Sequence, residues 1–186
     1  MLLKFFTHTY AIILDIKTEN SLSIVHRADL IHFESYFSAG GNTAKVAGKL
    51  AVGIGADLYG IKPEVPYTKE DLNWRNKQSR SSVEMNDKSS RPAIVRGDVD
   101  LSGYDTVYLG FPIWWYVAPT IVNSFLEAYD FSGKKIVLFA TSGSSDFGST
   151  AAELKPSAPG AEIVEAKVLS GLITEGKIEK LVELCQ

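Results

Sequence analysis

The amino-acid sequence predicts a three-layer, doubly wound α/β fold, in which helices cover both faces of a five-stranded parallel sheet. Two observations carry this prediction. From residue 29 onward, short apolar runs alternate with segments of helical periodicity. The runs are apolar at nearly every position, as in strands that are buried on both faces. Because connections between parallel strands are right-handed, few topologies remain, and five such strands fit the order 2-1-3-4-5.

Each strand and helix of this fold has its own segment of the chain. The expected strands cover residues 30–37, 56–61, 104–111, 135–140 and 162–169. The expected helices cover residues 43–52, 118–128 and 150–154, followed by a last helix that Thr174 caps. His32 and Glu34 fall within the first strand, where burial on both faces would require a hydrogen-bonding partner for each.

Composition limits the class of protein. The chain has 186 residues, which suits one domain with a full core, and 45% of them are hydrophobic. The net charge of −3 argues against nucleic acid as the main partner. No apolar run is long enough for a membrane span. The only cysteine, Cys185, excludes a disulfide within the chain and fits a cytoplasmic protein, and the three scattered histidines give no metal cluster.

Two segments lie outside the regular alternation. Residues 1–28 are expected to form an N-terminal extension with no assigned role, so the main domain would cover residues 29–186. Residues 62–100 are polar and contain three prolines, and they are too long for a plain loop. We interpret them as an insertion with one helix, beginning near 69–72, and with a mobile rim at residues 79–82. Long ordered loops are usually kept for a site, so the insertion is expected to border a ligand pocket.

The hexapeptide Ser38-Ala39-Gly40-Gly41-Asn42-Thr43 is the most informative motif. It follows an expected strand and precedes an expected helix. The first N–H groups of a helix have no internal partner and favour an anion, and glycines allow the backbone to approach it closely. The motif contains no Lys or Arg, which predicts a neutral cradle for a phosphate monoester. A simple capped turn at a helix start remains the alternative.

Two further loops follow neighbouring strands. Residues 110–116 carry two of the three tryptophans of the chain, Trp114 and Trp115, beside Tyr116. Adjacent side chains on an extended chain cannot both point into one core, so a flat apolar ligand explains them better than a core cluster. Residues 141–149 are small and polar, and such a loop can surround the hydrogen-bonding edge of a heterocycle. A phosphate cradle, an aromatic wall and a polar edge together match flavin mononucleotide (FMN).

These motifs resemble those of the flavodoxin family. Residues 36–43 are similar to its Tyr-Phe-Ser-x-x-Gly-Asn-Thr motif, and residues 110–115 and 140–143 look like its other two flavin loops. Residues 67–85 resemble its insertion. Gly40 departs from the motif, because a hydroxyl residue is common there. The resemblance covers about residues 30–186 and implies a flavodoxin-like fold that binds FMN. The implied cofactor-binding residues are Ser38, Ala39, Gly40, Gly41, Asn42, Thr43, Ala44, Pro112, Ile113, Trp114, Trp115, Tyr116, Thr141, Ser142, Gly143 and Ser144.

Three functions follow as hypotheses. The first is a redox protein that transfers electrons through bound FMN to a redox partner protein or a small electron acceptor. The second is an NAD(P)H-dependent reductase of quinone-like acceptors, which needs an open flavin face. The third is a non-redox binding module that has lost the cofactor. The sequence leaves open the electron donor and acceptor, a homodimer, and whether the protein is an enzyme or an electron carrier.

Overall fold

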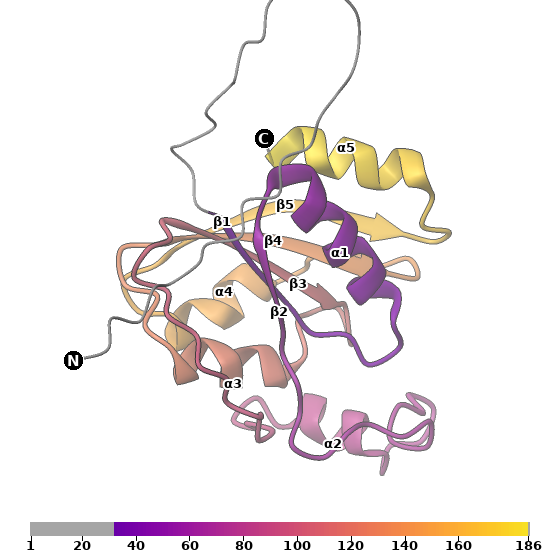
Figure 1. Cartoon of the computed structure of the whole chain (residues 1–186). Helices are drawn as coiled ribbons and strands as arrows, with labels where there is room; N and C mark the ends of the chain where they lie inside the picture. Colours follow the sequence, from indigo (N-terminus) through magenta and orange to yellow (C-terminus); the bar gives the residue numbers. More distant parts are fainter. Residues whose placement is uncertain (1–31, 186) are drawn as a thin grey trace, which may run out of the picture.

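The computed structural model describes residues 32–185 and contains a five-stranded parallel sheet (Figure 1). The strand order is β2-β1-β3-β4-β5, and every neighbouring pair is parallel, so the predicted fold class is confirmed. The strands are β1 (His32–Tyr36), β2 (Asp57–Gly60), β3 (Thr106–Pro112), β4 (Lys135–Ser142) and β5 (Glu162–Ser170).

Helices cover both faces of the sheet (Figure 1). On one face lie α1 (Asn42–Ile54) and α5 (Glu175–Cys185), and on the other lie α3 (Thr120–Ala128) and α4 (Thr150–Leu154), which continues into the 3₁₀ helix η1 (Lys155–Ser157). A shorter helix, α2 (Arg80–Asn86), belongs to the predicted insertion and lies beside the sheet near α3. The predicted N-terminal extension, residues 1–28, lies outside the described residues.

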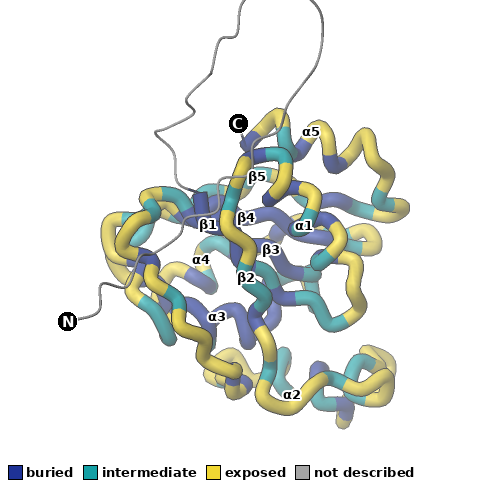
Figure 2. Tube along the Cα trace, in the orientation of Figure 1, coloured by how far each residue is buried: buried dark blue, intermediate teal, exposed yellow. Residues whose placement is uncertain are grey.

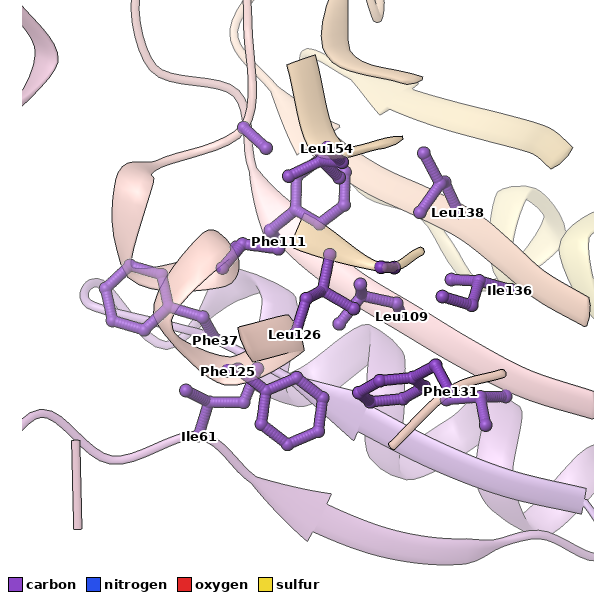
Figure 3. Close-up of a cluster of buried hydrophobic side chains, with 14 of the residues drawn as sticks. Phe37, Ile61, Leu109, Phe111, Phe125, Leu126, Phe131, Ile136, Leu138 and Leu154 are labelled. Atoms are coloured by element: carbon purple, nitrogen blue, oxygen red, sulfur yellow. The ribbon is translucent and has the colours of Figure 1, made fainter. Parts of the chain in front are cut away.

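Each layer of helices packs on its own core cluster, and the central strands are buried on both faces (Figure 2). Figure 3 shows the larger cluster, where Leu109 and Phe111 of β3 meet Phe125 and Leu126 of α3. On the opposite face, Gly110 is paired with Phe139, and a Cβ at Gly110 would lie 2.2 Å from the Phe139 ring. Only glycine therefore leaves room for this phenyl ring under α1 and α5.

His32 and Glu34, both in β1, have different surroundings. The His32 Nδ1 atom lies 3.4 Å from the Ile54 carbonyl oxygen, and the imidazole meets the ring of Tyr108 edge-on. The carboxyl group of Glu34 is fully buried and has no hydrogen-bond partner in the described part of the chain. Burial raises the pKa of Glu34 to about 9, so this carboxyl group is protonated at neutral pH. The expected pairing of both groups holds only for His32.

The insertion is more ordered than its sequence predicts. Residues 68–72 form a single helical turn, in which Leu72 N–H donates to the Thr68 carbonyl at 3.2 Å. The helix itself begins later: the expected mobile rim at residues 79–82 is instead the start of α2, and Ser79 caps it by accepting from Ser82 N–H. Ser81 and Ser82 are buried, because α2 packs this hydroxyl-bearing face inward. Within residues 32–185, no helix is both long and apolar enough to cross a membrane.

Candidate functional site

A cavity of about 640 Å³ lies where β1, β3 and β4 end, as is usual for ligand sites in such sheets. The three predicted loops, the insertion and the segment after β5 all contribute to it. Within the described part of the chain, no charged side chain lines it. The lining residues are Ser38, Ala39, Gly40, Asn42, Thr43, Leu72, Trp74, Ser81, Pro112, Ile113, Trp114, Trp115, Tyr116, Thr141, Ser142, Gly143, Ser145, Gly171 and Ile173.

The loop between β1 and α1 leaves the start of the helix open. Gly41 adopts a left-handed conformation, with φ of 86°, and no side chain of the described residues caps α1. Gly41 N–H donates to the Ser38 hydroxyl at 3.1 Å, which holds the loop in its turn. The first N–H groups of α1 therefore remain available to an anion. Gly41 and Ala44 belong to this loop and first turn but do not line the cavity itself.

The loop after β3 is a tight turn with an unusual backbone. Trp114 and Val117 exchange two backbone hydrogen bonds, of 2.9 and 3.0 Å, around Trp115 and Tyr116. Both central residues have positive φ, 45° and 71°, as in a type I′ turn, where Asn and Gly are usual. Bulky residues held in this region cost roughly 1–3 kcal/mol each and cluster at functional sites. The turn thereby presents two aromatic side chains at its tip.

The two tryptophans diverge, as their adjacency predicts. Trp114 is half-buried and packs edge-on against the rings of Phe37 and Tyr67, with centroid distances of 5.7 and 5.5 Å. Trp115 is 41% exposed. A core cluster therefore describes Trp114 in part, whereas Trp115 lies outside the core. Both residues line the cavity.

The loop after β4 provides the polar edge. The Ser142 hydroxyl accepts from Ser145 N–H at 2.8 Å, and the Ser142 carbonyl accepts from Gly171 N–H at 3.0 Å. These bonds bring Ser145 and the segment after β5 to the cavity, which the sequence reasoning missed. Ser144, which the resemblance implied, instead lines a shallow hollow beside β5.

The insertion supplies the remaining wall through Leu72, Trp74 and Ser81. Its position is fixed by a polar cluster behind the aromatic wall. The Tyr67 hydroxyl donates to Glu84 Oε2 at 2.5 Å, Arg80 Nε donates to Glu84 Oε1 at 2.7 Å, and the Arg80 guanidinium lies 4.1 Å above the Tyr67 ring. Burial, followed by the Glu84 contact, raises the pKa of Tyr67 far above its usual value, so the phenol keeps its proton. The length of the insertion predicted that it borders the pocket, and Trp74, an isolated tryptophan in a polar segment, was a further signal for this wall.

Comparison with known proteins agrees with this geometry. The family model for flavodoxin matches residues 32–185. The chain belongs to the flavodoxin family. No curated protein matches it significantly. The insertion and all three loops of this flavodoxin-family protein lie within the matched residues.

Several solved structures are similar to this flavodoxin-family chain. A putative flavoprotein from Bacteroides uniformis ATCC 8492 shares 42% identity, with a TM-score of 0.77 over 83% of this chain and 98% of that one. A putative flavoprotein from Bacteroides eggerthii DSM 20697 shares 45% identity, with a TM-score of 0.74 over 83% and 96%. A flavoprotein from Lactobacillus acidophilus NCFM, solved in complex with FMN, has the same fold at 18% identity, with a TM-score of 0.61 over 82% and 98%.

Proposed function

We propose that this protein binds FMN in the 640 Å³ cavity and transfers electrons through it. The observation that carries the proposal is one cavity that joins the uncapped N-terminus of α1 to the exposed aromatic turn at Trp115. The structure of the Lactobacillus acidophilus flavoprotein in complex with FMN supports the choice of cofactor. When bound, FMN supplies one- and two-electron chemistry that amino-acid side chains lack.

The phosphate end of the cofactor would bind at the start of α1. Ser38, Asn42 and Thr43 line this end of the cavity, and the helix dipole adds a partial positive charge there. Because no Lys or Arg among residues 32–185 lines the cavity, the donors that these residues offer the dianion are neutral. The cradle offers one set of helix N–H groups, which suits the single phosphate of FMN better than the diphosphate of FAD.

The ring end would lie between the loops after β3 and β4. Pro112, Ile113 and Trp115 offer apolar surface to a flat ring, and aromatic contacts add about 0.5–1.5 kcal/mol each beyond burial. Thr141, Ser142 and Gly143 offer hydroxyl and N–H groups to the polar edge of that ring.

The surroundings of the cavity favour a small electron acceptor over a steered protein partner. Trp74 is 66% exposed and Tyr116 is 71% exposed, and both border the cavity. A dedicated electron carrier usually presents a strongly charged face to its partners. Here the mouth is mainly aromatic, with the Arg75 guanidinium 4.9 Å above the Trp74 ring, and it is not a strongly charged face, which supports the reductase form of the proposal. The only cysteine is buried and forms no disulfide, as is usual for proteins of the reducing cytoplasm, and we expect the protein to act there.

Flavin titration tests the proposal. The purified protein is titrated with FMN, FAD and riboflavin while flavin fluorescence is followed, and the FMN complex is then reduced and reoxidised. We expect FMN to bind more tightly than either of the other flavins, and its spectrum to change reversibly on reduction. A protein that ignores added FMN would instead be the non-redox binding module. Equal or tighter binding of FAD would contradict the single-phosphate cradle.

A further inference from the structure

A second cavity, of about 590 Å³, shares the aromatic turn with the first. Trp115 and Tyr116 line both cavities, so the turn forms a common wall between them. The rest of the second cavity comes from the end of the insertion and from the facing parts of α3 and α4. Its volume falls within the usual range of small-molecule sites.

The interior of this cavity combines apolar surface with one unpaired hydroxyl. Met85, Leu154 and Pro156 provide apolar side chains along its wall. Thr120, at the start of α3, is 7% exposed, and its hydroxyl has no hydrogen-bond partner among residues 32–185. A buried hydroxyl without a partner costs stability, and because this oxygen is itself closed off from the cavity it offers no hydrogen bond to a ligand there.

Two cations stand at the rim. Lys88 is in an ion pair with Glu153 at 3.1 Å, but its side chain is 81% exposed and has further N–H donors. Arg91 bonds Glu127 through Nε and two carbonyl oxygens through Nη1, and its Nη2 has no bond in the described part of the chain. Among residues 32–185, no charged side chain lines the first cavity, whereas Lys88 and Arg91 line the second.

We propose that the second cavity binds a planar conjugated organic anion, whose ring lies against Trp115 and Tyr116 and whose anionic group bonds Lys88 and Arg91. The apolar wall and the aromatic turn would contact the ring, and the two cations at the rim would bond the anionic group. The inference deepens the proposed function and rests on it for one point only. If FMN fills the first cavity, the bound ring lies across the turn from it.

Calorimetry with a pair of ligands tests the site. The probes are anthraquinone-2-sulfonate and the neutral 2-(hydroxymethyl)anthraquinone, each titrated into the FMN-loaded protein so that the phosphate cradle is filled. We expect the sulfonate to bind about tenfold more tightly, as two charge-assisted contacts at a partly exposed rim allow. The double variant Lys88→Ala/Arg91→Ala should lose that advantage, while its affinity for the neutral ring and for FMN stays unchanged.

Two further variants sharpen the test. Glu153→Gln removes a carboxylate from the cavity lining and frees Lys88, so the sulfonate should bind more tightly. Lys180→Ala, on the exposed surface of α5 across the sheet, should change nothing. Equal affinity for the two probes, unchanged sulfonate binding by the double variant, or displacement of FMN by the sulfonate would overturn the site. If FMN itself does not bind, the same titrations of the flavin-free protein still decide the second cavity, so the two proposals fail separately.

Discussion

The Oγ1 atoms of Thr43 and Thr141 lie 2.9 Å apart, and this hydrogen bond joins the start of α1 to the end of β4. Both residues are buried and both line the candidate flavin cavity. In the sheet, β3 lies between β1, which leads into α1, and β4. The bond therefore joins two segments that are not neighbours in the sheet. It therefore fixes the phosphate cradle relative to the polar edge of the site, the two parts that one flavin would have to span.

Replacing Thr43 by Ala should weaken FMN through its phosphate. If Thr141 donates to Thr43, the Thr43 hydroxyl keeps its own proton for a phosphate oxygen. Loss of one hydrogen bond to a charged group costs about 1.5–3 kcal/mol, so FMN affinity should fall roughly tenfold or more. Riboflavin, which lacks the phosphate, should bind almost as before, and Thr43→Ser should retain the FMN affinity. Equal losses for FMN and riboflavin in fluorescence titrations would remove Thr43 from the cradle.

Alanine substitutions of the two tryptophans should have different effects on FMN affinity and on folding stability. Trp115 is 41% exposed, so Trp115→Ala should change the unfolding free energy of the flavin-free protein by no more than about 1 kcal/mol while it weakens FMN by lost ring contact. Trp114 packs on Phe37 and Tyr67, so Trp114→Ala should destabilise that protein by roughly 3 kcal/mol. Denaturant unfolding and FMN titration of both variants check this. A destabilised Trp115→Ala protein with unchanged FMN affinity would assign Trp115 to the core.

The regular part of the fold was predictable because its signals are local. Continuous apolar runs such as 135–140 mark strands that are buried on both faces, and the parallel order follows from the alternation with helices. The insertion was harder, because its helix is held by side-chain contacts within the insertion rather than by periodicity. Ser79 caps α2, and Arg80 and Glu84 bind Tyr67, but a run of serines and one arginine in the sequence indicates a loop.

The candidate site was predictable where one loop carries several unusual residues. The glycine-rich turn and the Trp-Trp pair are of this kind. Ser145, Gly171 and Ile173 carry no such signal. Ser145 is held by the Ser142 hydroxyl, and Gly171 by the carbonyl groups of Ser142 and Gly143, and neither bond can be read from the sequence. The positive φ of Trp115 and Tyr116 also had no sequence signal, since aromatic residues are poor candidates for a type I′ turn.

Gly148 should be essential for the position of the aromatic turn. A Cβ at this residue would lie 2.4 Å from the Tyr116 carbonyl oxygen, and the backbone has a positive φ of 56°. Gly148→Ala should therefore cost about 2–5 kcal/mol in unfolding free energy, from backbone strain and steric overlap together. Gly133→Ala is the matched control: φ is 74° there but nothing lies within 4 Å, so only the strain of about 1–2 kcal/mol should remain. Equal losses in the two variants would exclude the overlap.

Glu34 should make the protein less stable as pH rises. The folded protein holds this carboxyl group protonated up to a pKa of about 9, whereas the unfolded chain releases the proton near the ordinary value of 4.5. Between these two values the folded state binds the extra proton, so the unfolding free energy falls with increasing pH, by about 1.4 kcal/mol per pH unit. Below pH 4.5 both states are protonated and the effect vanishes, and above pH 9 it increases no further.

Substitution of Glu34 isolates this effect. Glu34→Gln keeps the shape of the side chain without its titration. The fall of the unfolding free energy between pH 5 and pH 9 should therefore lose most of the contribution of about 1.4 kcal/mol per pH unit. Burial raises the pKa of Cys185 to about 11 and of Tyr108 to about 12, so neither neighbour titrates within this window.

Glu34→Leu removes the unpaired carboxyl group altogether and should exceed the wild type in stability at pH 8, because an apolar side chain needs no partner there. Glu162→Gln, on the exposed start of β5, is the control and should leave the slope as it is. Urea unfolding of the four proteins across this pH range measures all of these slopes, and a wild-type stability that stays level from pH 5 to pH 9 would show that Glu34 finds a partner for its charge.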